Sequence, residues 1–306
     1  MIKVNFKGTD ITESVSINTC YHDMYAETQS DTLCIMFNDT QCQWDKWQPK
    51  TGDEIKVDYG SLSTGKMFVD SAAPRNGLYK IVATSVPLSS KEPKNKAWQK
   101  INLTQIGAEI AGHHGLGFKQ YGVTDVLYDY VLQTNKSDFA FLNHLCTLEG
   151  CAFLVYDGTL VMYSQSYMET QSPIKSIDLS LDADFDCFDH SARQYGSCKI
   201  ERGLYKGDFD AGNGCSRVFI PTIEMTINNA AEANRYAKSL LRNENKNALT
   251  GYIRGRIMPE YAAASTATLN SVRSPSWNGT IFLYHVRNDY AKGNTKMFFR
   301  KPLEGY

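Results

Sequence analysis

Apolar and polar residues alternate in a pattern that predicts strands over the first ninety residues. Residues 55–59 read Ile-Lys-Val-Asp-Tyr, the period of two that is typical of a strand with one buried face. Residues 33–37 are apolar at every position, which predicts a strand buried on both faces. Further strands are expected at 67–70 and 79–83, with a turn at 74–77 between them. Short strands at this spacing predict a small antiparallel barrel or sandwich.

The pattern changes after residue 88. Residues 89–100 hold four Lys and only one large apolar residue, Trp98, so this segment is expected to be a linker or an exposed loop. A helix capped by Thr104 is expected next, with Ile106 and Ile110 on its apolar face. The sequence Gly-Leu-Gly at 115–117 is expected to end that helix.

A second helix is expected to begin at Ser137, a good capping residue. Its apolar residues recur at steps of three and four up to Gly150, which is expected to end it. Residues 151–156 and 159–163 then flank Asp157-Gly158, a dipeptide that favours a two-residue hairpin turn. We therefore expect a mixed α/β unit over about residues 95–165.

The last part of the chain predicts mostly strands, for example at 254–258 and 281–286. One long helix is expected at 229–247, where Ala, Tyr and Leu follow the helical period. We find no internal repeat in the sequence.

Composition narrows the class of protein. A length of 306 residues suggests about two domains. Lys and Arg total 32 against 33 Asp and Glu, a balance that argues against specific nucleic-acid binding. Aromatic residues reach 12%, with 18 Tyr, which favours β structure and protein interfaces. The longest apolar run, 151–156, is far shorter than a membrane span, and residues 1–10 do not resemble a signal peptide.

The eight cysteines include no C-x-x-C pair, so zinc-ribbon and thioredoxin-like sites are not expected. They are expected to be mostly small core residues of a chain made in a reducing cytoplasm.

Two clusters of possible metal ligands fit a structural interpretation better. His113 and His114 have only Glu109 at helical spacing, which is too few ligands, so a polar helix end is expected. Asp182, Asp184 and Asp186 do not match a calcium loop, because Cys and Arg stand where Gly and Glu are needed. Their period of two instead predicts an edge or lumen-facing strand.

The sequence offers no recognisable catalytic motif. G-x-S-x-G is absent, no cysteine lies in a catalytic context, and the glycine-rich segments 113–117 and 212–214 lack the features of a phosphate-binding loop. A spatial pair of carboxylates for glycoside hydrolysis remains open, since such pairs need not be close in sequence. We therefore expect no catalytic, cofactor-binding or metal-binding residue and no cofactor.

Two stretches resemble a known family, the late-control protein D or baseplate hub proteins of contractile phage tails, prophages and tailocins. Residues 44–87 carry a tryptophan pair, then Gly-Asp before a strand, then Thr-Gly-Lys-Met-Phe-Val-Asp. Residues 128–163 carry Gln, Ser-Asp, Phe-Leu, Glu-Gly and Asp-Gly-Thr-Leu in the family's order. The final segment, 300–306, is also similar to the end of such hubs. The signature positions are Trp47, Gly52, Asp53, Gly65, Asp138, Phe141, Leu142, Gly150, Asp157 and Gly158.

The resemblance implies a β-rich α+β fold. It would contain two small tail-tube-like antiparallel β-barrels, at 1–90 and 173–306, with an α/β insertion domain at 91–172 between them. The second barrel would include the long helix at about 229–247.

The resemblance also implies a structural role and no enzymatic activity. Three chains would form a homotrimeric ring that joins the hexameric tail tube to the central trimeric spike. Tape-measure protein and other baseplate proteins are further partners that it allows, and no membrane is involved. The chain would reside in the tail baseplate of a virion or tailocin, after assembly in the bacterial cytoplasm. The alternative function is a tail-tip peptidoglycan-degrading enzyme.

Overall fold

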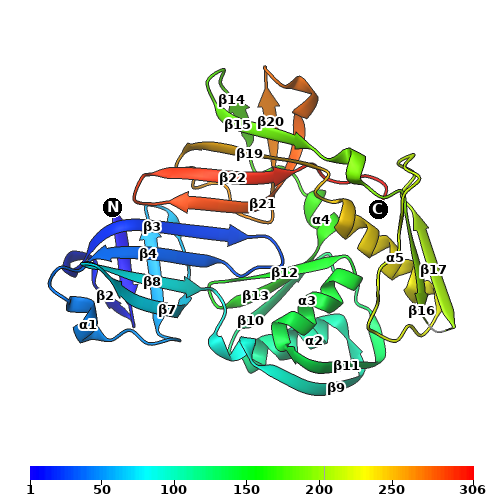
Figure 1. Ribbon diagram of the computed structural model, residues 1–306, viewed down its shortest axis with the longest axis horizontal. Coiled ribbons are helices and arrows are strands. Elements are labelled where there is room, and N and C mark those ends of the chain that lie inside the picture. Colours follow the sequence, from blue (N-terminus) through cyan, green and yellow to red (C-terminus); the bar gives the residue numbers. More distant parts are fainter. Residues whose placement is uncertain (203) are drawn as a thin grey trace.

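The computed structural model describes residues 1–202 and 204–306, which contain 22 strands and five α-helices. The largest sheet has 14 strands, and three smaller sheets have two or three strands each. The large sheet extends across the upper and left parts of Figure 1, and the three smaller sheets lie below it and to the right. The fold is β-rich, as predicted from the sequence.

The first eight strands form one end of the large sheet, with antiparallel neighbours in the order β3-β4-β8-β7-β5-β1-β2. Their inner face packs around the buried ring of Trp44 on a short helix, α1. The strands predicted at 33–37, 55–59, 67–70 and 79–83 are confirmed. The elements are β1 (Ile2–Phe6), β2 (Thr9–Asp10), β3 (Ser16–Tyr25), β4 (Thr32–Asn38), α1 (Gln43–Trp47), β5 (Glu54–Tyr59), β6 (Leu62–Ser63), β7 (Met67–Arg75) and β8 (Leu78–Thr84).

Strand β4 is fully buried on one face only. Leu33, Ile35 and Phe37 enter the core, whereas Cys34 and Met36 on the other face are half-buried. The prediction of burial on both faces was wrong because apolar side chains do not require complete coverage, and this sheet covers only one of its faces fully. The turn between β7 and β8 is also shorter than predicted, since β7 continues to Arg75.

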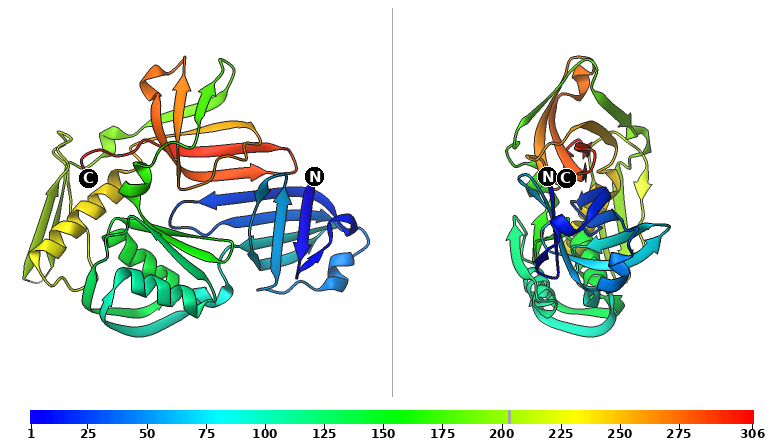
Figure 2. Two further views of the ribbon diagram at one scale, coloured as in Figure 1. Left: turned by 180° about the vertical axis from the view of Figure 1, so that it is seen from behind. Right: turned by 90° about the vertical axis from the view of Figure 1, so that its left-hand side faces the viewer.

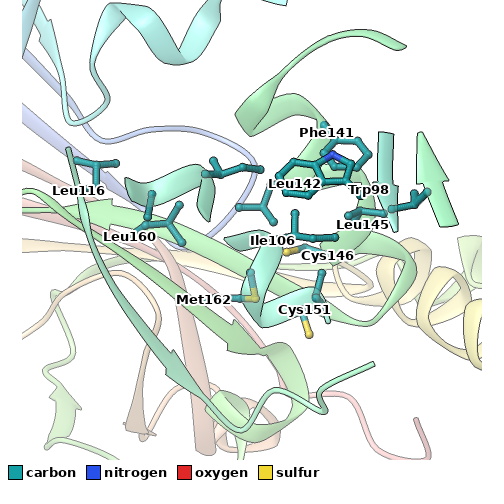
Figure 3. Packing of buried hydrophobic residues seen from close by; sticks show 14 of the residues in the cluster. Trp98, Ile106, Leu116, Phe141, Leu142, Leu145, Cys146, Cys151, Leu160 and Met162 are labelled. Atoms are coloured by element: carbon teal, nitrogen blue, oxygen red, sulfur yellow. The ribbon is translucent and has the colours of Figure 1, made fainter. Parts of the chain in front are cut away.

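The middle of the chain forms an α/β unit in which two helices lie between two sheets. The ribbon β9-β11 covers one side of α2 and α3, and the sheet β10-β13-β12 covers the other (Figures 1 and 3). Both predicted helices and the hairpin at Asp157-Gly158 are confirmed. The elements are β9 (Pro93–Asn102), α2 (Leu103–His113), β10 (Gly117–Tyr121), β11 (Leu127–Ser137), α3 (Asp138–Leu148), β12 (Cys151–Tyr156), β13 (Thr159–Ser164) and α4 (Gln165–Glu169).

Strand β9 replaces most of the predicted linker at 89–100. Trp98 is 3% exposed and stacks on Phe141 of α3, with ring centroids 6.1 Å apart. Lys94 and Lys96 pair with acidic residues of the helices, Asp138 and Glu109. The loop prediction was wrong because the lysines cover the helices through their long side chains while one tryptophan supplies the apolar anchor.

Helix α2 begins two residues earlier than predicted. Its N-cap is Asn102, which forms a capping box with Gln105, and the Asn102 N–H donates to Gln105 Oε1 at 3.0 Å. The Thr104 hydroxyl, expected to be the cap, instead donates to Asp125 at 2.8 Å.

The last part of the chain supplies the other end of the large sheet and a separate three-stranded sheet. Helix α5 packs on that small sheet, on the far side of the α/β unit from the first strands (Figure 2). The predicted long helix is confirmed, with Asn229 as its cap. The elements are β14 (Ser176–Leu179), β15 (Asp184–Asp189), β16 (Ser197–Arg202), β17 (Tyr205–Asp210), β18 (Val218–Phe219), α5 (Ala230–Asn245), β19 (Leu249–Arg256), β20 (Ser265–Ser271), β21 (Gly279–Asp289) and β22 (Asn294–Arg300).

The predicted acidic edge strand is confirmed in part. Asp184 and Asp186 lie exposed on β15, the last strand of the large sheet, and Phe185 between them is half-buried. Asp182 is also exposed, but it lies in the turn before the strand.

The two ends of the large sheet, one formed by the first eight strands and the other by the last strands, are joined by the pairing of β3 with β21. The register places Tyr25 opposite His285 and Tyr21 opposite Asp289. Residues 260 or more positions apart in sequence therefore share one continuous sheet, and the loop after β3 lies beside the α/β unit.

Candidate functional site

The loop at 26–31, between β3 and β4, is the point where the parts of the chain meet. The hydroxyl of Tyr163 on β13 donates to the carbonyl of Ala26. Ala26 also belongs to an apolar cluster with Ala152 of β12 and Phe282 of β21. This loop therefore contacts both the α/β unit and the last strands, and its charged residues, Glu27 and Asp31, are enclosed by these contacts.

A buried ion network extends from Glu27. Arg300 Nη1 of β22 lies 2.6 Å from Glu27 Oε1, and Lys246 after α5 pairs with the same carboxylate. Arg300 Nη2 also lies 2.9 Å from Glu169 Oε1 of α4, and Arg242 Nη2 of α5 lies 2.5 Å from Glu169 Oε2. All five side chains are at least nine-tenths buried. The network links β22, α4 and α5 to the loop.

Electrostatics in this network favour the charged forms of Glu27 and Arg300. Burial alone would raise the pKa of Glu27, but Arg300 and Lys246 outweigh it and lower that pKa to about 2. Arg300 is almost inaccessible, yet the two carboxylates raise its pKa above the ordinary value despite burial. Lys246 differs, because burial lowers its pKa despite the pairing with Glu27. The ion pairs hold these elements in fixed positions.

A second polar cluster joins Ser89, His114 and Asp138. Ser89 Oγ lies 2.9 Å from His114 Nδ1, and His114 Nε2 lies 2.9 Å from Asp138 Oδ2. Local sequence patterns do not predict this alignment, because the three residues come from three separate segments. The predicted polar helix end is confirmed, since α2 ends at His113 with His114 as its C-cap, but the His114 side chain is 2% exposed and pairs with Asp138 instead of facing solvent.

Asp138 accepts hydrogen bonds from Lys94 and Gln133 in addition to its contact with His114. Lys94 Nζ lies 2.7 Å from Oδ2, and Gln133 Nε2 donates to Oδ1 at 2.9 Å. Burial raises the pKa of Asp138, but the bonds from Gln133, Lys94 and His114 outweigh it and lower the pKa. Because Lys94 already balances the carboxylate charge, little remains to stabilise an imidazolium during catalysis. The geometry suits a clamp between the segment at Ser89 and the two helices.

The signature positions of the resemblance to the hub family lie in turns, helix caps and apolar cores. Trp47 packs edge-on against Trp44 at 4.9 Å, and the Asp53 carboxylate accepts from the Lys50 N–H at 2.7 Å. Phe141 and Leu142 belong to the core of the α/β unit (Figure 3). The backbone has positive φ at the remaining positions, which are Gly52, Gly65, Gly150, Asp157 and Gly158.

Gly65 and Asp157 come from the two separate stretches and touch each other. The Lys66 N–H donates to Asp157 Oδ1 at 3.0 Å, and the Tyr156 hydroxyl donates to the Ser63 carbonyl at 3.3 Å. A Cβ on Gly65 would lie 2.9 Å from the Cβ of Asp157, and the φ of Gly65 is +63°. Only glycine allows the hairpin β12–β13 to approach the first strands this closely.

Metal ligands, membrane-spanning helices and cysteines are the other features that could point to a function. In residues 1–202 and 204–306, no group of three or more His, Cys, Asp or Glu is arranged to hold a metal ion. No helix in this part of the chain is long and apolar enough to cross a membrane. All eight cysteines are free; Cys20, Cys146, Cys151 and Cys198 are buried, as predicted, whereas Cys42 is exposed.

Known structures share this fold over nearly the whole chain. A 43 kDa tail protein of the prophage MuSo2 from Shewanella oneidensis is 13% identical, with a TM-score of 0.78, and 98% of each chain is covered. A tail protein from Neisseria meningitidis MC58 is 11% identical, also with a TM-score of 0.78, over 98% of this chain and 95% of that one.

A type VI secretion component from E. coli, described as structurally similar to the T4 phage tail proteins gp27 and gp5, is 11% identical. Its TM-score is 0.63, over 99% of this chain and 78% of that one. No family model and no curated protein matches the chain. The structures to which this chain is similar thus include prophage tail proteins and a type VI secretion component that itself resembles phage tail proteins, and the resemblance seen in the sequence is confirmed at the level of the fold.

Proposed function

We propose that this chain is a structural baseplate hub protein of a contractile phage tail or tailocin. Three copies form a ring that joins the hexameric tail tube to the central trimeric spike. The observation that carries this proposal is the similarity to prophage tail proteins over nearly the full length of both chains. A match from end to end supports a shared architecture better than a match to one common domain would.

The proposed architecture has two tube-like barrels, at 1–90 and 173–306, with the insertion domain at 91–172. Two separate apolar cores support it: one surrounds Trp44 among strands β1–β8, and the other surrounds Phe299 among β14, β15 and β19–β22. Three chains with two barrels each form a ring of six barrels, which matches the sixfold symmetry of the tube. The ring itself has threefold symmetry, which matches the trimeric spike. Within residues 173–306, α5 and the small three-stranded sheet form an additional layer. Arg235 of α5 pairs with Glu149 of the insertion domain at 2.6 Å.

The proposed role needs rigidity more than chemistry. The network around Glu27 and Glu169, the clamp at Asp138 and the close approach of Gly65 to Asp157 each join different parts of the chain. A ring that transmits force between a tube and a spike requires such fixed joints. These contacts support a structural role over that of a tail-tip peptidoglycan-degrading enzyme, and we propose that the ten signature positions serve the fold.

The oligomeric state tests the proposal directly. Light scattering of the purified chain, alone or with its tube and spike proteins, is expected to give a mass near three times 34.4 kDa per hub. Electron microscopy of the same sample is expected to show rings with threefold symmetry. A chain that stays monomeric and binds neither protein would contradict the proposal, and lysis of peptidoglycan in a zymogram would favour the enzyme.

A further inference from the structure

A cavity of about 390 Å³ lies at the same junction. Strand β3, the turn after β5, the hairpin β12–β13 and the loop after β19 form its wall. Much of that wall is apolar, with Met24, Leu62, Leu154 and Val161 among its residues. Three tyrosines, Tyr25, Tyr156 and Tyr261, also line it. An apolar chain with a polar end would fit such a surface.

Asp31 is the acidic residue of this cavity. Its side chain lines the wall and is 5% exposed, and its Oδ1 accepts from the Tyr25 N–H at 2.8 Å. In the part of the chain that the structure describes, no basic side chain lies within ion-pair distance of it. The other buried acids nearby differ, because Glu27 pairs with Arg300 and Lys246, and Asp23 pairs with Arg287 and His285.

An unpaired buried carboxylate is costly, since its charge loses water without gaining a counter-ion. Burial raises the pKa of Asp31 to about 7; the charge of Asp23 adds to the rise, and the bond from the Tyr25 N–H opposes it. A cation entering the cavity would remove this cost. Tyrosine rings attract cations through their faces, and apolar walls suit the methylene groups of a lysine side chain.

We propose that this cavity receives a lysine side chain from a neighbouring protein of the tail, whose ammonium group pairs with the Asp31 carboxylate. The charge complementarity between a buried, unpaired acid and a primary ammonium selects this occupant over a neutral one. The identity of the neighbour rests on the proposed function, but the existence of the site does not. Since the cavity is bordered by both ends of the large sheet and by the insertion domain, the lysine bridges all three.

Binding of n-butylammonium, which mimics a lysine side chain, tests the site on the isolated full-length chain. Titration at pH 8 followed by NMR is expected to show saturable binding to the wild type and to Asp129→Asn, an exposed control on β11. Asp31→Asn keeps the shape of the side chain and is expected to bind at least ~10-fold more weakly. The neutral analogue n-butanol is expected to bind the wild type no better than it binds Asp31→Asn.

The pH provides a second measurement. At pH 5.5 the wild type is expected to bind n-butylammonium about 30-fold more weakly than at pH 8, because Asp31 is then protonated. The other titratable groups that line the cavity with Asp31 are Tyr25, Tyr156 and Tyr261, and the charge of Asp23, which pairs with His285 and Arg287, also acts on Asp31. Asp31→Asn retains all of these groups, so its binding is expected to lack this dependence on pH.

A variant that fills the cavity distinguishes the effect of lost space on n-butylammonium binding from the effect of lost charge. Ala262→Phe places a ring in the cavity wall without changing any charge, and it is expected to weaken n-butylammonium binding as well. Unchanged binding in Asp31→Asn or Ala262→Phe, or equal binding of n-butanol, would overturn the proposal. Trimer formation is measured separately. A trimer that does not bind n-butylammonium would refute this inference alone. A monomer that binds n-butylammonium would refute the proposed function alone.

Discussion

Replacing Asp31 with Asn should stabilise the isolated protein at alkaline pH. The substitution keeps the oxygen that accepts the Tyr25 N–H, so the loop at 26–31 retains its hydrogen bond. It removes the only ionisable group of the side chain, which is 5% exposed. The free energy of unfolding of the variant therefore lacks the cost of holding this carboxylate charged inside the fold.

The magnitude follows from the pKa. Folding raises the pKa of Asp31 from 3.8 to about 7, because burial disfavours the charged form. The folded state then binds more protons than the unfolded state between these two values, so the contribution of Asp31 to stability falls as pH rises through that window. The loss is complete above the folded pKa. A shift of about three units corresponds to about 4 kcal/mol.

Urea unfolding of the wild type and Asp31→Asn between pH 5 and 8.5 measures this cost. The difference in the free energy of unfolding is expected to grow by about 1.4 kcal/mol per pH unit from pH 5 to 6.5 and to level off above pH 7.5. Taking the difference cancels residues common to both proteins, such as Glu27, whose lowered pKa of about 2 gives the opposite slope at low pH. A difference that does not vary with pH, or a variant less stable than the wild type at pH 8, would refute the reasoning.

Two further substitutions test the joints between parts of the chain. Gly65→Ala is expected to destabilise the protein by about 2–3 kcal/mol and to expose the hairpin at Asp157 to proteolysis, whereas Gly60→Ala, with nearly the same φ but no atom within 4 Å of its Cβ, should cost about 1 kcal/mol. Equal effects of the two would show that the close approach is unimportant. Glu169→Gln leaves buried Arg242 without a carboxylate partner and Arg300 with Glu27 alone, and it is expected to lower the free energy of unfolding by about 3–5 kcal/mol in urea, against little change for Glu13→Gln on the surface. A loss below about 1 kcal/mol would mean that the network contributes little.

Local patterns predicted the elements that depend on local contacts. The helix beginning at Ser137 and the hairpin at Asp157-Gly158 are confirmed because capping and turn formation involve residues only a few positions apart. Strand β9 was missed for the opposite reason. Its partners, Asp138 and the ring of Phe141, lie about 40 residues further along the chain, and only they turn a lysine-rich segment into a covered strand.

The candidate site was not predictable from the sequence for the same physical reason. Glu27 and Arg300 are 273 residues apart, and neither position is unusual among 32 basic and 33 acidic residues. Asp31 differs from other acidic residues only in the folded structure, where it has no basic partner, whereas Glu27 in the same loop pairs with Lys246 and Arg300. A fold that neutralises one buried acid so completely and leaves its neighbour without a counter-ion has a position that a cation from outside the chain can fill. The charge left unpaired in the isolated chain is therefore the feature that most directly connects the fold of the single protein to its assembly.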